Sequence, residues 1–152
     1  MNKISNYLSL IKFGHTIFAM PFALIGFFLA VNFTNAELNW KLFFLVILCM
    51  VFARNAAMAF NRYIDRNIDS KNKRTVVREI PSGIISAKNA LMFVVLNSVF
   101  FVATTSFINE ICFFLSPVAL LIVLGYSYTK RFTALCHVIL GIGLSLAPIG
   151  AW

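Results

Sequence analysis

Long apolar runs separated by short polar stretches dominate this sequence. A helix needs about 20 mostly apolar residues to cross the hydrocarbon core of a bilayer. Five runs approach this length: about Phe13 to Phe33, Trp40 to about Phe60, about Ala90 to Ile108, about Ile111 to Tyr126, and about Phe132 to Trp152. We therefore expect an all-α, polytopic transmembrane helical bundle, with no linker, repeat or second domain.

Composition supports a membrane protein over a soluble domain. Of 152 residues, 61% are hydrophobic and 12% are charged, whereas soluble domains carry about 25% charged residues. A net charge of +8 would suggest nucleic acid for a soluble protein. Basic residues of membrane proteins, however, collect in cytoplasmic loops, so we expect contact with membrane lipid and no nucleic-acid partner. Cys49, Cys112 and Cys136 lack metal-site or disulfide spacing and are interpreted as packing residues.

The basic residues also predict the orientation. If the N-terminus is cytoplasmic, nearly all of them lie inside, leaving Lys41 outside and Arg54 within a span. The first apolar run exceeds the roughly 7–15 residues of a signal-peptide core and has no clear cleavage site, so we interpret it as a retained helix. Pro21 is expected to kink it. The prediction is a multi-pass protein of the cell inner membrane.

Ionisable residues in or beside a span are costly and are therefore functional candidates. Arg54, Asn61 and Asp65 fall on one stripe of the second predicted helix, with Asp69 about 60° away. Asp65 and Asp69 suit a hard cation such as Mg²⁺, and the basic cluster from Lys71 to Arg78 would suit a diphosphate. As alternatives, the two carboxylates could form solvated ion pairs, and Arg54 could extend toward an interface.

Three segments resemble the UbiA prenyltransferase family, and the resemblance covers essentially the whole chain. The first aspartate-rich motif of that family resembles Asn61-Arg62-Tyr63-Ile64-Asp65-Arg66-Asn67-Ile68-Asp69, preceded by Arg54 and followed by Lys73-Arg74 and Arg78-Glu79-Ile80-Pro81-Ser82-Gly83. The other two matches are Lys12-Phe13-Gly14-His15-Thr16 with Pro21-Phe22-Ala23, and Tyr126-Ser127-Tyr128-Thr129-Lys130-Arg131. The 4-hydroxybenzoate polyprenyltransferase branch is the most similar.

The resemblance implies an enzyme that uses Mg²⁺ to hold a polyprenyl diphosphate and transfers the prenyl group to an aromatic acid, such as 4-hydroxybenzoate, in quinone biosynthesis. The metal and diphosphate site would include Asn61, Asp65 and Asp69. Further implied contacts are Arg74, Lys130 and, more weakly, Lys12 to the diphosphate, and Arg54 to the acceptor's carboxylate. His15 also matches the family pattern, with a packed or hydrogen-bonded role as the alternative.

Two departures from the family pattern are present. Arg62 stands where the family often has Asp, and the second aspartate-rich motif of these roughly nine-helix proteins lies beyond this chain. We therefore expect residues 1–152 to form the N-terminal part of a single domain, with about five of nine spans, that is inactive alone. The alternatives are a menaquinone-pathway or haem-farnesylating prenyltransferase, and a non-catalytic membrane protein: an inactive truncated product or a helical subunit of a larger assembly.

Overall fold

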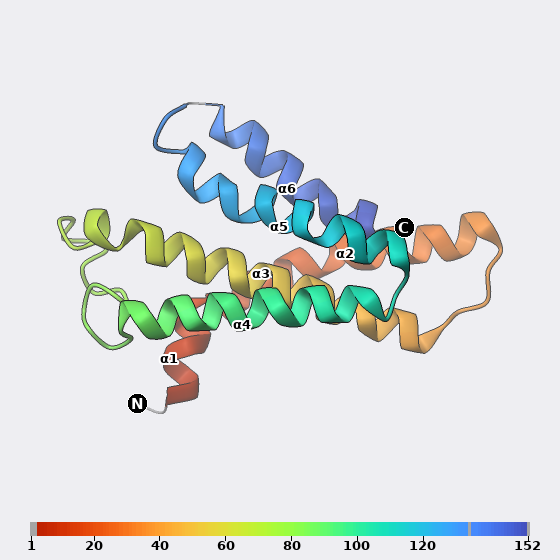
Figure 1. Ribbon diagram of the computed structural model, residues 1–152, viewed down its shortest axis with the longest axis horizontal. Coiled ribbons are helices and arrows are strands. Elements are labelled where there is room, and N and C mark those ends of the chain that lie inside the picture. The colour runs from red at the N-terminus through yellow and green to blue at the C-terminus, as the bar shows by residue number, and fades with distance from the viewer. Residues whose placement is uncertain (1–2, 134, 152) are drawn as a thin grey trace.

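The computed structural model is an elongated bundle of helices (Figure 1). It describes residues 3–133 and 135–151, without the side chains of residues 3, 15, 18 and 19. Across these residues the elements are α1 (Lys3–Leu10), α2 (Phe13–Thr34), α3 (Trp40–Asp69), α4 (Ala87–Ser106), α5 (Glu110–Thr129) and α6 (Cys136–Ala151). No strand occurs within the described ranges, and the expected all-α fold is confirmed.

Among the residues that the structure describes in full, α3, α4 and α5 are long and apolar enough to cross a membrane. They correspond to the second, third and fourth predicted spans. The first and fifth predicted spans correspond to α2, a helix of 22 residues, and to the apolar helix Cys136–Ala151. The fifth helix begins later than predicted because a turn follows α5, in which the backbone N–H groups of Arg131 and Phe132 donate to Tyr128 and Thr129. Trp152, its predicted end, lies outside the described residues.

One feature of the fold was not predicted: the helix α1 precedes the first span. The apolar run of the second span was expected to end at about Phe60, and α3 continues for nine residues beyond it, to Asp69. Asn61, Asp65 and Asp69 therefore lie on one helix, as predicted. Buried Ile64 and hydrogen bonds from α5 and the Ser70–Ser86 connection stabilise this extension against the rest of the protein.

The helices α3, α4 and α5 each have a side-chain cap at the N-terminus. Asn39, Ser86 and Asn109 each accept a hydrogen bond from the backbone N–H three residues later, at 3.2, 3.2 and 2.7 Å. A helix start leaves such donors unpaired, and Asn and Ser are favoured there for this reason. Lys12, between α1 and α2, has φ 47° and ψ 63°. This left-handed conformation allows the chain to change direction between the two helices.

Two apolar clusters hold the bundle. One lies toward the end where α3 and α5 finish and includes Leu10, Ala56, Ala59, Ala90 and Val94. The second, nearer the start of α3, comprises Ala23, Phe27, Val46, Met50 and Ala151. Alanines let helices approach closely. The helices α2 and α6 also approach closely, because a Cβ on Gly26 would lie 2.4 Å from the carbonyl oxygen of Pro148.

The candidate site residues of α3, α5 and the Ser70–Ser86 connection lie at one end of the bundle, which we call the polar end. It contains the C-terminal ends of α3 and α5, the Ser70–Ser86 connection and the start of α4, on the left in Figure 1. Large apolar side chains are exposed along the outward faces of the helices, among them Phe22, Phe100, Phe114 and Leu121. Soluble monomers rarely expose so much apolar surface, and its presence here is consistent with contact with lipid.

Candidate functional site

The polar end of α3 meets the C-terminal turn of α5. Lys130, the C-cap residue of α5, extends its Nζ to α3, where it donates 2.7 Å to Asn61 Oδ1 and also donates to a carboxylate oxygen of Asp65. Arg131 Nη2 donates 2.7 Å to the carbonyl of Ile64 and lies 3.7 Å from Asp65 Oδ1. Residues more than 60 positions apart thus form one cluster of two cations, an amide and a carboxylate.

Asp69, one helical turn further along α3, is bound by residues of the Ser70–Ser86 connection. Arg78 Nη1 donates to both of its carboxylate oxygens, at 2.8 and 2.7 Å. Thr75 Oγ1 donates 2.9 Å to the backbone carbonyl of Asp69. The Ser70–Ser86 connection therefore folds back over the end of α3, and Asp69 as a residue is only 6% exposed.

The side chains of Asp65 and Asp69 both line one recess at the polar end. Its lining residues are Asp65, Ile68, Asp69, Lys130 and Arg131. Two acids and two bases share this space, so a bound cation and a bound anion could be stabilised side by side. Charge-assisted hydrogen bonds of this type are stronger than neutral ones.

The oxygen donors fit a hard cation. Asp65 Oδ1 is buried and accepts no hydrogen bond in the described part of the chain, and Arg131 Nη2 lies 3.7 Å from it. The ammonium of Lys130 contacts oxygens of both Asn61 and Asp65, and these oxygens are therefore already arranged around a positive charge. Among the described residues, no three or more His, Cys, Asp or Glu side chains lie close enough together to hold a metal ion. Mg²⁺ needs fewer protein ligands, commonly one or two carboxylates with water and phosphate oxygens.

The remaining predicted site residues lie apart from this recess. Arg54 is half-buried in α3, and its Nε is buried without a hydrogen-bond partner among the described residues. Seven residues separate it from Asn61, or about 10 Å along a helix. Arg74 and Lys12 are exposed and do not line the recess as the structure describes it. The side chain of His15 lies outside the described part.

Sequence reasoning missed two arginines that organise the site. Arg78 holds Asp69, and Arg131 approaches Asp65. Both belong to the matched motifs; Arg78 was included in the basic cluster suited to a diphosphate, and Arg131 was assigned no role at the site. The available signal was the excess of bases around two carboxylates, which predicts ion pairing without identifying the partners. Arg62, at the position where the family often has Asp, is buried, and its Nη1 has no hydrogen-bond partner among the described residues.

Comparison with known proteins supports what the site suggests. The model of the UbiA prenyltransferase family matches residues 19–152. This chain belongs to the UbiA prenyltransferase family. Over 110 residues it is 36% identical to the 4-hydroxybenzoate octaprenyltransferase of Aliivibrio salmonicida, covering 72% of this chain and 38% of that protein. The protein of the same name from Vibrio cholerae is 35% identical over 106 residues, covering 70% and 37%. The matched part thus spans well under half of these relatives.

Solved structures of UbiA homologues share the fold. The apo structure of a homologue from Aeropyrum pernix K1 matches with a TM-score of 0.82 and 33% identity, over 91% of this chain and 49% of that chain. A homologue from Archaeoglobus fulgidus, bound to GPP and Mg²⁺, matches with a TM-score of 0.72 and 23% identity, over 96% and 53%. UbiA membership, this fold and the apolar helices identify an integral membrane protein.

Proposed function

We propose that the whole protein transfers a polyprenyl group from a polyprenyl diphosphate to an aromatic acid such as 4-hydroxybenzoate, in quinone biosynthesis. The observation that carries the proposal is the convergence of Asn61, Asp65, Lys130 and Arg131 at the polar end of a UbiA-family bundle. The relatives named 4-hydroxybenzoate octaprenyltransferase favour this acceptor. The excess of basic residues at the polar end favours a cytoplasmic N-terminus in the inner membrane.

Mg²⁺ is the cofactor that we infer. Asn61, Asp65 and Asp69 would hold it, because they supply oxygen donors over about two helical turns and the buried Oδ1 of Asp65 accepts no hydrogen bond within the described part of the chain. When bound there, Mg²⁺ would neutralise part of the diphosphate's negative charge. Of the homologues compared, the Archaeoglobus fulgidus structure carries GPP and Mg²⁺. The inference for this chain depends on its own donor set and family.

The basic residues would stabilise the leaving group. As the allylic C–O bond breaks, negative charge develops on the diphosphate, and donors already fixed in place stabilise it most effectively. Lys130 and Arg131 line the recess and would donate hydrogen bonds to the oxygens of the diphosphate. Arg74 and Lys12, which are exposed in the structure, would approach the diphosphate from the rim of the recess.

Arg54 would orient the acceptor. Its unpartnered Nε lies about two turns deeper than Asn61, where a charge needs a specific partner. An aromatic carboxylate bound by Arg54 would place its ring between this residue and the diphosphate. The electron-rich ring carbon then attacks the allylic carbon and loses a proton, while the surrounding apolar helices exclude water that would otherwise capture the cation.

A prenyl-transfer assay on the protein expressed from its complete reading frame tests the proposal. Wild-type protein in vesicles should prenylate 4-hydroxybenzoate only when Mg²⁺ is supplied, and the double variant Asp65→Asn, Asp69→Asn should lose the reaction. Glu37→Gln, which also removes a carboxylate but in the connection between α2 and α3, is the matched control and should retain activity. Full activity in the double variant would overturn the assignment of this site.

A further inference from the structure

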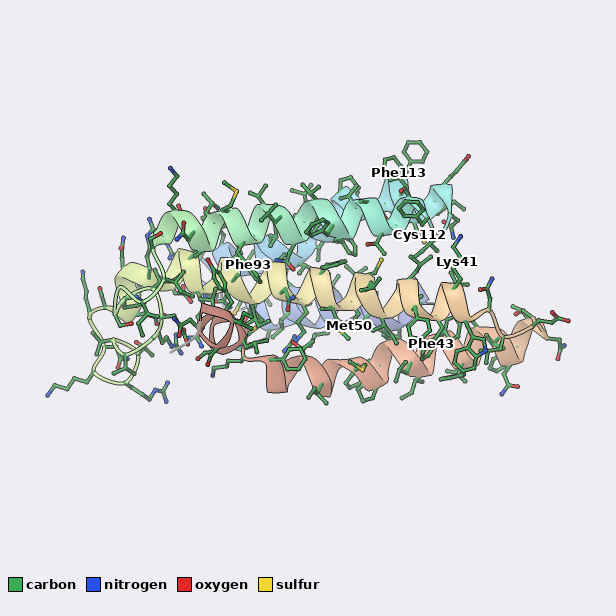
Figure 2. The ribbon with its side chains drawn as sticks, turned by 90° about the horizontal axis from the view of Figure 1, so that it is seen from below. Lys41, Phe43, Met50, Phe93, Cys112 and Phe113 are labelled. Atoms are coloured by element: carbon green, nitrogen blue, oxygen red, sulfur yellow. The ribbon has the colours of Figure 1, made fainter. Side chains whose placement is uncertain are left out.

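The helix α1 differs from the rest of the bundle in its direction. In Figure 1 it runs steeply away from the long axis that α3, α4 and α5 follow, and in Figure 2 the same dark red helix is seen end-on. Because α3, α4 and α5 are long and apolar enough to cross a membrane, their shared direction approximates the membrane normal. A helix perpendicular to that direction lies in the plane of the membrane.

The contacts of α1 set its depth. Tyr7 stacks on Phe93 of α4, with ring centroids 5.1 Å apart, and Leu10 is completely buried in the cluster that contains Ala59, with Phe60 packed against it. Counting from Trp40 at about 1.5 Å per residue, Phe60 lies about 30 Å along α3, which is the thickness of the hydrocarbon core. The helix α1 therefore lies at the boundary between hydrocarbon and headgroups.

Six of the eight residues of α1 define three faces. Tyr7 and Leu10 face the bundle, whereas Ser5 and Ser9 lie on a polar face, from which Ser9 donates to Glu79 of the Ser70–Ser86 connection. Ile4 and Leu8, four residues apart on a third face, are 74% and 43% exposed. Residues at this spacing are neighbours on a helix surface, so they form one continuous apolar strip.

The charge and the surroundings of this strip suit a lipid boundary. Lys12, which follows α1 closely, is exposed and would meet anionic headgroups, which attract basic residues beside a membrane. On α4, Met92, next in sequence to the stacked Phe93, is also exposed, at 54%.

We infer that α1 is an in-plane membrane helix whose Ile4 and Leu8 side chains insert into the acyl-chain boundary of the leaflet at the polar end. Such helices lie with their apolar face about 5–10 Å within the headgroup and acyl boundary. The hydrogen bond from Ser9 to Glu79 then connects this membrane-bound helix to the segment that carries Arg78, the partner of Asp69. The inference stands on the orientation and exposure of α1, independently of the proposed activity.

Site-directed fluorescence tests this arrangement. In the full chain with Cys49, Cys112 and Cys136 replaced by Ala, an environment-sensitive NBD label is attached to Ile4→Cys or Leu8→Cys, with Ser5→Cys as the matched control on the polar face. The labelled proteins are reconstituted in phosphatidylethanolamine and phosphatidylglycerol vesicles. Each must first elute from gel filtration in detergent at the volume of the unlabelled protein, which establishes that it is folded.

Labels at positions 4 and 8 should emit at shorter wavelength than the label at position 5. They should be quenched several-fold more strongly by lipids brominated on the acyl chains, whereas iodide in the buffer should quench the label at position 5 more strongly. Equal iodide quenching at all three positions would overturn the inference. Protection of positions 4 and 8 from both quenchers would also overturn it, because the strip would then be covered by protein, either a second copy or another part of the same molecule.

Discussion

The two ends of α3 differ in the interactions that stabilise them: aromatic contacts near the start, and ion pairs at the polar end. Near its start, Phe43 contacts the rings of Phe27 and Trp40 at centroid distances of 5.5 and 5.7 Å, and these contacts contain no charge. At its other end, Asp65 and Asp69 are engaged by cations from α5 and from the Ser70–Ser86 connection. Apolar packing is present toward both ends of α3, and the polar end adds ion pairs to it.

This difference separates stability from chemistry along a single helix. Apolar packing contributes to folding and offers nothing to a diphosphate. The ion pairs at the polar end each have a partly exposed member, and such pairs contribute modestly to stability. Under the proposed function, these carboxylates would bind the metal and these bases the diphosphate, in place of one another. Variants at the two ends should consequently fail in different ways.

The largest expected effect is that of Lys130→Met on prenyl transfer. The substitution keeps much of the side-chain volume but removes the donor that reaches Asn61 and Asp65. Loss of one preorganised donor to a developing negative charge typically lowers kcat by about 10²–10³-fold. The rate at saturating Mg²⁺ and substrate measures this. Lys88→Met, an exposed lysine at the start of α4, is the control, and an equal loss in both variants would contradict a local role for Lys130.

Next in size is the effect of Arg78→Gln on the Mg²⁺ requirement. Arg78 fixes both oxygens of Asp69, and loss of groups that orient metal ligands commonly weakens metal affinity by about 10–100-fold. The Mg²⁺ concentration giving half-maximal activity should rise accordingly, with a smaller change in the rate at saturation. If the saturated rate falls while the Mg²⁺ requirement stays constant, Arg78 does not act through Asp69.

The contacts of these polar residues show where sequence reasoning reached its limit. Helical periodicity correctly placed Asn61, Asp65 and Asp69 along one helix, because 100° per residue follows from local geometry. That Lys130 contacts Asn61 and Asp65, whereas Arg74 stays exposed, depends on how α5 and the Ser70–Ser86 connection pack on α3. Such long-range packing leaves no periodic signal in a single sequence.

At the opposite side of the comparison, Gly26→Ala should destabilise the bundle. A Cβ at this position would lie 2.4 Å from the carbonyl oxygen of Pro148, so α2 and α6 would have to move apart, and overpacking of this kind costs about 1–3 kcal/mol. Denaturant unfolding in detergent micelles measures the loss. Gly14→Ala, where an added Cβ meets nothing within 4 Å, is the control. Stability equal to that of the control would show that the two helices are not closely packed there.

The apolar part of the fold was more predictable, with one instructive exception. Runs of apolar residues located the three membrane-length helices α3, α4 and α5, because the bilayer thickness fixes their length. The same criterion missed α1, whose eight residues are too few to span and whose surface alternates polar and apolar faces. An amphipathic segment next to Lys12 was the available signal, and a search for spans alone passes over it.

The smallest expected effect is at the start of α3, where Asn39→Ala removes the N-cap. The Asn39 side chain accepts from the backbone N–H of Leu42 at 3.2 Å, and loss of such a cap costs about 0.5–2 kcal/mol. Denaturant unfolding should show this decrease, while the Mg²⁺ requirement and the rate per folded molecule should stay at wild-type values, because the cap is remote from the recess. Asn39→Asp keeps an acceptor and should retain most of the stability. A change in the Mg²⁺ requirement of Asn39→Ala would mean that the two ends of α3 are coupled, and the separation of stability from chemistry along this helix would then be wrong.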